Sequence, residues 1–431
     1  MNSSVLINPN ALRVGMYIQL EVGWMRHPFP VNSFRIVSDS QLQTLKALGL
    51  DAIRYFPALS EIASFESVGD ADAAPAHAAP MTQLAPAAPG DAAEAAQARP
   101  PEPGSALEPA SHALPPLWRR CDERFRAAAR EYMQLYACAA AQPEQALAKS
   151  HGMVQGYLQD VLPAGDLVIR LLSESSGHRQ AEHPVNVTVL CLLLGRTLGM
   201  NAADLYELGL AALLHDIGKD PKPGATPMPR VQYERHVGDS VALAMGMGVS
   251  SDVLTAMAQH HEFADGSGFP LHLIGEDLSA AGKVLCLVNA YDRLCNPEFA
   301  QEGQTPHEAL SVLYAQYRER FDPAILKAFI RMMGVYPPGS VVQLADGRFA
   351  MVVSVNSSRP LKPQVLVYDA QVPLAQALPL DLEMFEEIGI RRSLRPDQLP
   401  REALSYLSPR QRICYFFERA VEPCAPKEQA P

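Results

Sequence analysis

The stretch LYELGLAALLHDIGK, at residues 205–219, decides the architecture of the largest part of the chain. Its apolar residues recur at three- and four-residue spacing, which predicts a helix that is buried on most sides. The helix carries His215 and Asp216 at its C-terminal end, and Lys219 follows. A histidine beside an aspartate offers ligands that suit first-row metals such as Fe, Mn and Zn. On its own, however, an HD dipeptide indicates little.

A second motif, QHHEFADGSGFP at residues 259–270, places His260 and His261 at the end of another expected helix. Successive side chains on a regular helix diverge by about 100°, so two neighbouring histidines favour a pair of adjacent ions over a single ion. We expect Glu262 to orient a histidine from behind the ligands. Two further histidines, His183 in EHPVN and His236 in YERH, stand in expected helices. Several rare residue types in this order predict a metal centre rather than ordinary core or surface histidines.

The same helical periodicity extends on both sides of these motifs and predicts an all-α bundle over residues 117–336. The expected helices, after a first one that begins at residue 117, are 153–175, 182–198, 202–217, 230–247, 250–260, 278–295, 306–318 and 322–334.

The flanking regions have a different pattern. Residues 1–66 predict a small α/β module, with strands at 5–7, 16–20 and 51–56 and a helix at 38–50. Residues 67–116 are rich in Ala and Pro, and we predict a disordered linker because they have too few apolar side chains to form a core. Residues 337–431 predict a small β-rich cap, with a hairpin turn at 345–347, a strand at 364–369 and a short helix within SPRQRICYFFERA at 408–420. The fold class is therefore multidomain and mainly α.

Composition narrows the functional classes. The 431 residues carry a formal net charge of −11, from 36 Lys+Arg and 47 Asp+Glu. An acidic chain binds nucleic acid poorly, so we expect no nucleic-acid partner. The most apolar stretch, 187–194, is too short to span a bilayer, and the N-terminus lacks the pattern of a signal peptide. The seven scattered cysteines form no CxxC pair, which is typical of a reducing compartment. We expect a cytoplasmic protein.

The order H…HDIGK…H…HHEFADGSGFP resembles the HD-GYP family, a branch of the HD metal phosphohydrolases found in bacteria. Gly268, Phe269 and Pro270 stand where that family has Gly-Tyr-Pro. The resemblance covers residues 170–335. Residues 13–30, RVGMYIQLEVGWMRHPFP, resemble the small uncharacterised module that often precedes HD-GYP domains.

The resemblance implies hydrolysis of the second messenger cyclic di-GMP, to linear pGpG or to GMP, with two divalent ions, Fe or Mn. Such ions lower the pKa of a water for in-line attack on phosphorus, and Lys219 adds positive charge. The implied catalytic residues are Asp216 and Lys219. The implied metal ligands are His183, His215, Asp216, His236, His260, His261 and Asn289, and the implied substrate contacts are Lys219, Asp265, Gly266, Gly268 and Arg293.

Several positions depart from the family pattern. Asn289 replaces the usual ligand aspartate, and an amide cannot bridge two ions as a carboxylate does. Arg179 stands where members with a third metal have a glutamate, which argues against a third ion. The family's Arg-Pro-Tyr is replaced by CNPEFAQ at 295–301, so Arg293 becomes the substitute candidate for holding substrate.

Two alternatives stay open at this point. The chain can be a weak or inactive cyclic di-GMP sensor, whose Gly-Phe-Pro loop docks a partner such as a diguanylate cyclase (GGDEF) domain. It can also be an HD hydrolase of another phosphate ester. Turnover of cyclic di-GMP with Mn or Fe separates these readings.

Overall fold

The computed structural model describes residues 4–20, 33–36, 39–60, 116–172, 176–219, 230–297, 303–356, 359–385 and 387–420. The described residues up to 60 form one compact unit, and those from 116 onward form a second. The predicted linker at 67–116 lies outside the described residues apart from its last position. The predicted domain boundaries therefore stay predictions.

The first unit is a small antiparallel sheet with one helix against it. Its strands are β1 (Val5–Ile7), β2 (Tyr17–Gln19), β3 (Ser33–Arg35) and β4 (Ile53–Tyr55), in the order β1-β4-β2-β3. Helix α1 spans Asp39–Ala47. Ile18, Ile36, Leu45 and Ile53 are almost fully buried and form the core. This confirms the predicted α/β module, although β3 was not expected from the sequence.

The second unit is mainly helical. Its helices are α2 (Pro116–Cys138), α3 (Pro143–Val161), α4 (Arg179–Thr197), α5 (Ala202–Leu214), α6 (Arg230–Met247), α7 (Ser251–Ala258), α8 (Ala280–Cys295), α9 (Pro306–Ala315) and α10 (Pro323–Met333). In the part of the chain that the structure describes, none of the helices combines the length and apolarity that crossing a membrane requires.

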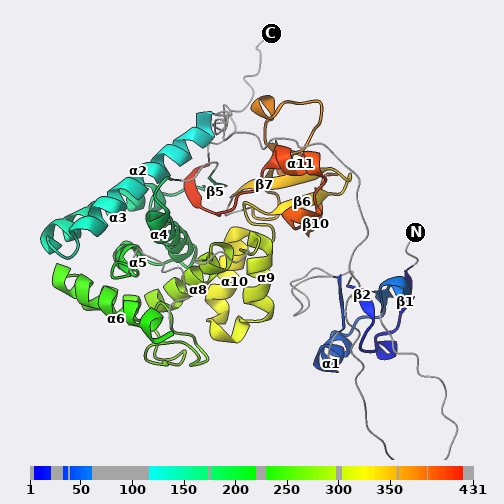
Figure 1. Cartoon of the computed structure of the whole chain (residues 1–431), viewed down its shortest axis with the longest axis horizontal. Helices are drawn as coiled ribbons and strands as arrows, with labels where there is room; N and C mark the ends of the chain where they lie inside the picture. Colours follow the sequence, from blue (N-terminus) through cyan, green and yellow to red (C-terminus); the bar gives the residue numbers. More distant parts are fainter. Residues whose placement is uncertain are drawn as a thin grey trace, which may run out of the picture. The chain divides into compact units, whose positions relative to one another are not determined.

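Helix α4 is the centre of this unit (Figure 1). Its residues from Ala181 to Gly195 are buried, apart from the half-buried His183, because α2, α3, α5, α8 and α10 pack around it. A helix that is apolar on every side needs this kind of enclosure. His183 lies near the start of α4, so the enclosure also fixes the place of a motif histidine.

A seven-stranded antiparallel sheet completes the second unit. Its strands are β5 (Leu167–Leu171), β6 (Val341–Leu344), β7 (Phe349–Asn356), β8 (Gln364–Val367), β9 (Leu380–Asp381), β10 (Ile390–Leu394) and β11 (Tyr415–Arg419), and helix α11 spans Arg401–Leu407. The main order is β10-β6-β7-β5-β11, with β8 paired to β7 and β9 paired to β8. The hairpin at 345–347, the strand at 364–369 and the β-rich C-terminal region are confirmed.

Two expectations were wrong, and they concern two strands that pair with each other. The helix expected at 153–175 ends at Val161 and is followed by β5, and the short helix expected within 408–420 is instead β11. The two strands run antiparallel, with Tyr415 opposite Leu171 and Arg419 opposite Leu167. Phe416 and Phe417 then enter the same core as α4. A pairing between such distant segments leaves no local periodicity to detect.

Candidate metal centre

The motif histidines come together from separate helices. His183 lies on α4, His236 lies on α6, and His215 caps the C-terminus of α5 with Asp216 next to it. His260 and His261 follow the end of α7. Two clusters of possible metal ligands result, one of His183, His215 and Asp216 and one of His236, His260 and His261.

Three of these imidazoles are oriented in the same way. In each, Nδ1 contacts the backbone carbonyl three residues earlier, and a carbonyl oxygen only accepts hydrogen bonds. Nδ1 must therefore carry the proton, which leaves the lone pair on Nε2. The pairs are His215 with Ala212 (2.7 Å), His260 with Met257 (2.6 Å) and His236 with Tyr233.

The unprotonated Nε2 atoms face one another in pairs. Nε2 of His183 lies 3.1 Å from Nε2 of His215, and Nε2 of His236 lies 3.2 Å from Nε2 of His260. Two nitrogens that each stand about 2.1 Å from one ion are roughly 3 Å apart. Two neutral acceptors at this distance have no hydrogen to share, so a cation between them accounts for their approach.

Asp216 lies between the two pairs and turns one oxygen to each. Its Oδ2 is 3.7 Å from Nε2 of His183 and 3.8 Å from that of His215. Its Oδ1 is 3.3 Å from Nε2 of His236 and 3.6 Å from that of His260. Oδ1 is buried and accepts no hydrogen bond from any described residue. An orphaned carboxylate oxygen among imidazole lone pairs fits a bound divalent cation.

The protonation states match this arrangement. Burial lowers the pKa of His215, His260 and His261, because a charged imidazole is poorly solvated there. Burial alone would raise the pKa of Asp216, but its neighbours, first of all the positive charge of Lys219, outweigh burial and hold that pKa well below the usual range. The centre therefore presents neutral nitrogens and an ionised carboxylate, the forms that bind metal.

His183 is oriented by a buried carboxylate instead of a carbonyl. Asp292 on α8 places Oδ2 2.5 Å from Nδ1 of His183, while its Oδ1 accepts hydrogen bonds from the side chains of Asn186 and Asn296. Both asparagines also bond to the segment just before and at the start of β11. Asn296 exchanges two hydrogen bonds with the backbone of Ile413, and Asn186 accepts one from the Tyr415 backbone. The segment that leads into β11 thus supports a candidate metal ligand.

A cavity of about 320 Å³ adjoins the second cluster. His260, His261, Asn289 and Arg293 line it, together with Tyr233 and Phe269. Phe269 stacks on His261, with ring centroids 4.5 Å apart, and the Tyr233 hydroxyl lies 3.2 Å from Nε2 of His261. Lys219 lies over the ring of Tyr233, with its Nζ 5.7 Å from the ring centroid and 3.3 Å from Asp216 Oδ2.

Sequence reasoning missed some residues of this cavity. Arg320 lies in the short 3-10 helix Arg318–Arg320, and its guanidinium covers the rings of Tyr317 and Phe263. Nothing in the sequence places that loop near His261, because only tertiary packing brings it there. Tyr233 had a detectable signal: it precedes His236 by three residues and so shares its helix face.

Asn289 lies in the cavity wall beside His260. Its Nδ2 donates to the backbone carbonyl of His260 at 3.1 Å, and its Oδ1 is buried without a hydrogen-bond partner among the described residues. The amide is therefore held in one orientation, with a free oxygen. This is the second orphaned oxygen of the site, and it is consistent with the predicted ligand position.

The glycine-rich loop packs against the backbone that begins at His261. Asp265, Gly266 and Gly268 do not line the cavity. Gly268 packs so closely that an added Cβ would lie 2.4 Å from backbone atoms of Glu262 and Phe263. Glu262 does not orient a histidine, because its carboxylate accepts the backbone N–H groups of Leu271 and Leu273. The loop therefore contributes to the site by holding Phe269 against His261.

Comparisons with known proteins agree with this geometry. Residues 166–325 match the family model described as the HD domain, and residues 4–161 match a domain of unknown function, DUF3391. The predicted HD-type domain and the predicted N-terminal module are thereby confirmed. HD domains bind divalent metal, and both ligand clusters lie within the matched residues.

Curated relatives match a part of the chain. A cyclic di-GMP phosphodiesterase of Pseudomonas aeruginosa is 32% identical over 206 residues, which are 45% of this chain and 50% of the relative. A cyclic di-GMP phosphodiesterase of Borreliella burgdorferi is 25% identical over 191 residues, 42% of this chain and 50% of the relative. A 3'3'-cGAMP-specific phosphodiesterase of Vibrio cholerae is 24% identical over 189 residues, 42% of this chain and 40% of the relative. The chain spans about half the length of the relatives it matches.

Proposed function

From an HD domain at residues 166–325, we propose that the protein is a metal-dependent phosphodiesterase that hydrolyses cyclic di-GMP to pGpG or GMP. The observation that carries the proposal is Asp216, whose two oxygens each face a different histidine pair. A carboxylate in this position would contribute one oxygen to each of two ions, and a pair of ions would supply the charge that holds a phosphodiester during in-line displacement. The names of the curated relatives support the substrate class.

Two divalent ions fit the donor set, and a site of imidazoles with few carboxylates accepts several first-row ions, of which we propose Fe or Mn. His183, His215 and Asp216 would hold one ion. His236, His260 and His261 would hold the other, with the free oxygen of Asn289 close by. When bound, the ions supply a more acidic water and neutralise phosphate charge.

The chain's own side chains divide the remaining tasks. Asp292 accepts a hydrogen bond from the Nδ1–H group of His183 and so keeps the lone pair of Nε2 available. Lys219, beside Asp216, adds a fixed positive charge that stabilises the charge developing on the phosphate. Arg293 and Arg320 line the adjoining cavity and replace the missing Arg-Pro-Tyr arginine as groups that hold the dinucleotide. Tyr233 and Phe269 offer aromatic faces on which a base can stack.

One observation favours a second role as a binding protein. After the Gly-Phe-Pro motif, Leu271 and Ile274 expose 61% and 52% of their surface. Exposed apolar side chains on a loop that contacts the centre suit docking of a protein partner, and a diguanylate cyclase domain is the candidate. This role is compatible with either active or weak hydrolysis.

The proposed place of action is the cytoplasm. The described cysteines are all buried and form no disulfide within the described residues, as in proteins of reducing compartments.

The test is elemental analysis of the full chain, purified without oxygen, beside a product assay. We expect close to two ions per chain and release of pGpG or GMP from cyclic di-GMP in the presence of Mn or Fe. Parallel assays with 3'3'-cGAMP measure substrate preference. Metal-loaded protein that binds cyclic di-GMP without turnover would replace the enzyme by the sensor, and metal-free protein after anaerobic purification would contradict both.

A further inference from the structure

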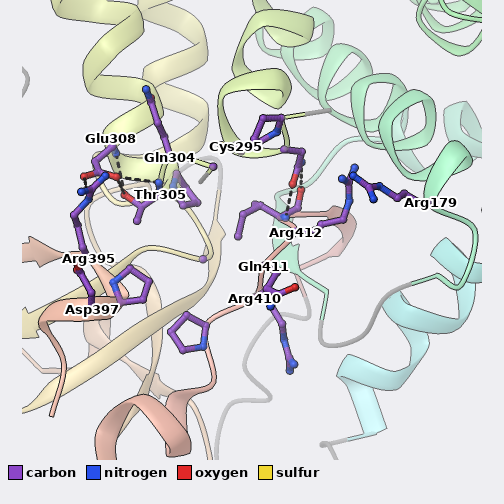
Figure 2. Close-up of a pocket in the computed structure, with 18 residues that line it drawn as sticks. Arg179, Cys295, Gln304, Thr305, Glu308, Arg395, Asp397, Arg410, Gln411 and Arg412 are labelled. Carbon is purple, nitrogen blue, oxygen red and sulfur yellow. Dashed lines mark hydrogen bonds and ion pairs between the residues drawn. The ribbon is translucent and has the colours of Figure 1, made fainter. Parts of the chain in front are cut away.

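A second, larger cavity lies between the helical bundle and the C-terminal region (Figure 2). Its volume is about 600 Å³, within the range of roughly 300–1,000 Å³ that is usual for small-molecule sites. It shares no lining residue with the cavity beside the metal centre. Four arginines stand in its wall: Arg179, Arg395, Arg410 and Arg412.

Positive charge exceeds negative charge among the described lining residues. The only carboxylates there are Glu308 and Asp397. Figure 2 shows Arg395 beside Glu308 on one side of the cavity and Arg179 with Arg412 on the other. Arg395 pairs with Glu308 at 2.8 Å, and Arg412 pairs with the buried Glu182 at 2.8 Å. A guanidinium has five N–H donors, so an arginine held by one carboxylate keeps donors for a further anion.

The arginines come from distant segments. Arg179 begins α4, Arg395 follows β10, and Arg410 and Arg412 precede β11. Guanidinium groups that reach one cavity from separate segments suit an anionic ligand, because each can donate hydrogen bonds to it. Polar Asn296 and Gln411 and the rings of Pro306 and Pro396 complete a wall that can meet both a phosphate and an organic ring.

We propose that this arginine cavity binds a phosphorylated small molecule of mononucleotide size, at a site separate from the metal centre. Planar guanidinium groups recognise phosphate through paired hydrogen bonds, which is why arginine dominates such sites.

The cavity is connected to the metal centre through two of its lining residues. Asn296 lines the cavity and donates to Asp292, and Asp292 in turn orients His183. Arg412 pairs with Glu182, the residue before His183. A ligand that binds to Asn296 or Arg412 therefore affects a neighbour of His183: Asp292 through Asn296, or Glu182 through Arg412. This consequence for hydrolysis rests on the proposed function, whereas binding does not.

The test measures GMP binding to the full chain by calorimetry, with guanosine as the phosphate-free probe. The variant Arg179→Ala with Arg410→Ala removes two exposed cavity arginines, and Arg391→Ala with Arg401→Ala removes two exposed arginines outside the cavity. We expect GMP to bind, guanosine not to bind, and the cavity variant to weaken GMP binding by at least about tenfold. The control variant should leave binding unchanged.

Repeating the titration after chelation separates the two sites. Binding in the arginine cavity persists without metal, whereas binding at the metal centre is lost. GMP affinity that vanishes on chelation, or that is equal in the cavity and control variants, would overturn the proposal. Neither outcome affects the assay for cyclic di-GMP hydrolysis, so failure of one proposal is distinguishable from failure of the other.

Discussion

Oδ2 of Asp292 lies 2.5 Å from Nδ1 of His183, and both residues are held by elements of the bundle, α8 and α4. Asp292 is 1% exposed, so its charge is satisfied by His183, Asn186 and Asn296 rather than by water. The contact fixes which nitrogen of His183 can face an ion.

Replacing Asp292 should therefore weaken metal binding without removing a ligand. Asp292→Asn keeps the size of the side chain but provides an amide that no longer requires a proton on Nδ1. We expect metal affinity to fall roughly 10- to 100-fold. Titration of Mn into metal-free protein measures it. Asp252→Asn changes an exposed aspartate of α7 and serves as the control; equal affinities for the two variants would contradict the positioning role.

Asn289→Asp should have opposite effects on the metal-free and metal-bound forms. Without metal, the new carboxylate is buried and faces the carbonyl of His260 in place of a donated hydrogen bond, so stability should fall on the order of 2 kcal/mol. With metal, the added negative ligand should tighten binding and raise the melting temperature. Thermal melts with and without Mn decide the matter. A variant whose two melts shift equally would place residue 289 outside the ligand set.

Acid should destabilise the metal-free protein below about pH 6.5, the ordinary value for histidine. His215, His260 and His261 have lowered pKa values in the folded state. Between the folded and unfolded pKa values the unfolded chain binds more protons, so stability rises with pH and is lost as pH falls through this window. The slope is at most roughly 1.4 kcal/mol per pH unit for each histidine.

Urea unfolding between about pH 7.5 and 5.5 measures that slope. His215→Asn, which retains a donor for the Ala212 carbonyl, should reduce it. A stability that is flat over this range would show that the three imidazoles become protonated while the protein stays folded.

A fourth prediction concerns the strand pair β5–β11. Arg170 and Glu418 form an ion pair there, with side chains only 7% and 11% exposed. Glu418→Gln leaves the arginine charge buried without its partner and should lower stability by about 3 kcal/mol. Arg170→Met combined with Glu418→Leu should restore much of the loss, because both charges are then gone. Denaturant unfolding of the three proteins checks this, and a harmless single variant would argue against the pairing.

The contrast between these strands and the helices shows what sequence can predict. The expected bounds of α6, 230–247, are those observed, because a three- to four-residue period is visible within the segment itself. Arg170 and Glu418 are 248 positions apart, and neither segment alone indicates its partner. Runs such as LVIRL and YFFER are compatible with a strand and also with the end of a helix. Only the pairing of the two segments determines that both are strands.

The same distinction applies to the candidate site. The histidines and Asp216 could be identified as ligands because their motifs are local and specific, and the structure brings all six together. Asn186, Asn296 and Arg320 could not, because their roles come from contacts with segments far along the chain. Sequence motifs therefore identify the candidate metal ligands. The residues that position these ligands can be identified only from the tertiary structure.

The bonds from Asn186 and Asn296 to residues 413–415 also fix an order of events during synthesis. All the motif histidines have been synthesised by residue 261. The segment that bonds to Asn186 and Asn296 leaves the ribosome only later, together with β11. Until then, β5 lacks one neighbour, and Asn186 and Asn296, which bond to Asp292, lack their bonds to the backbone of residues 413 and 415. The centre therefore matures late, and a chain that stops short of residue 413 carries every motif without a properly assembled site.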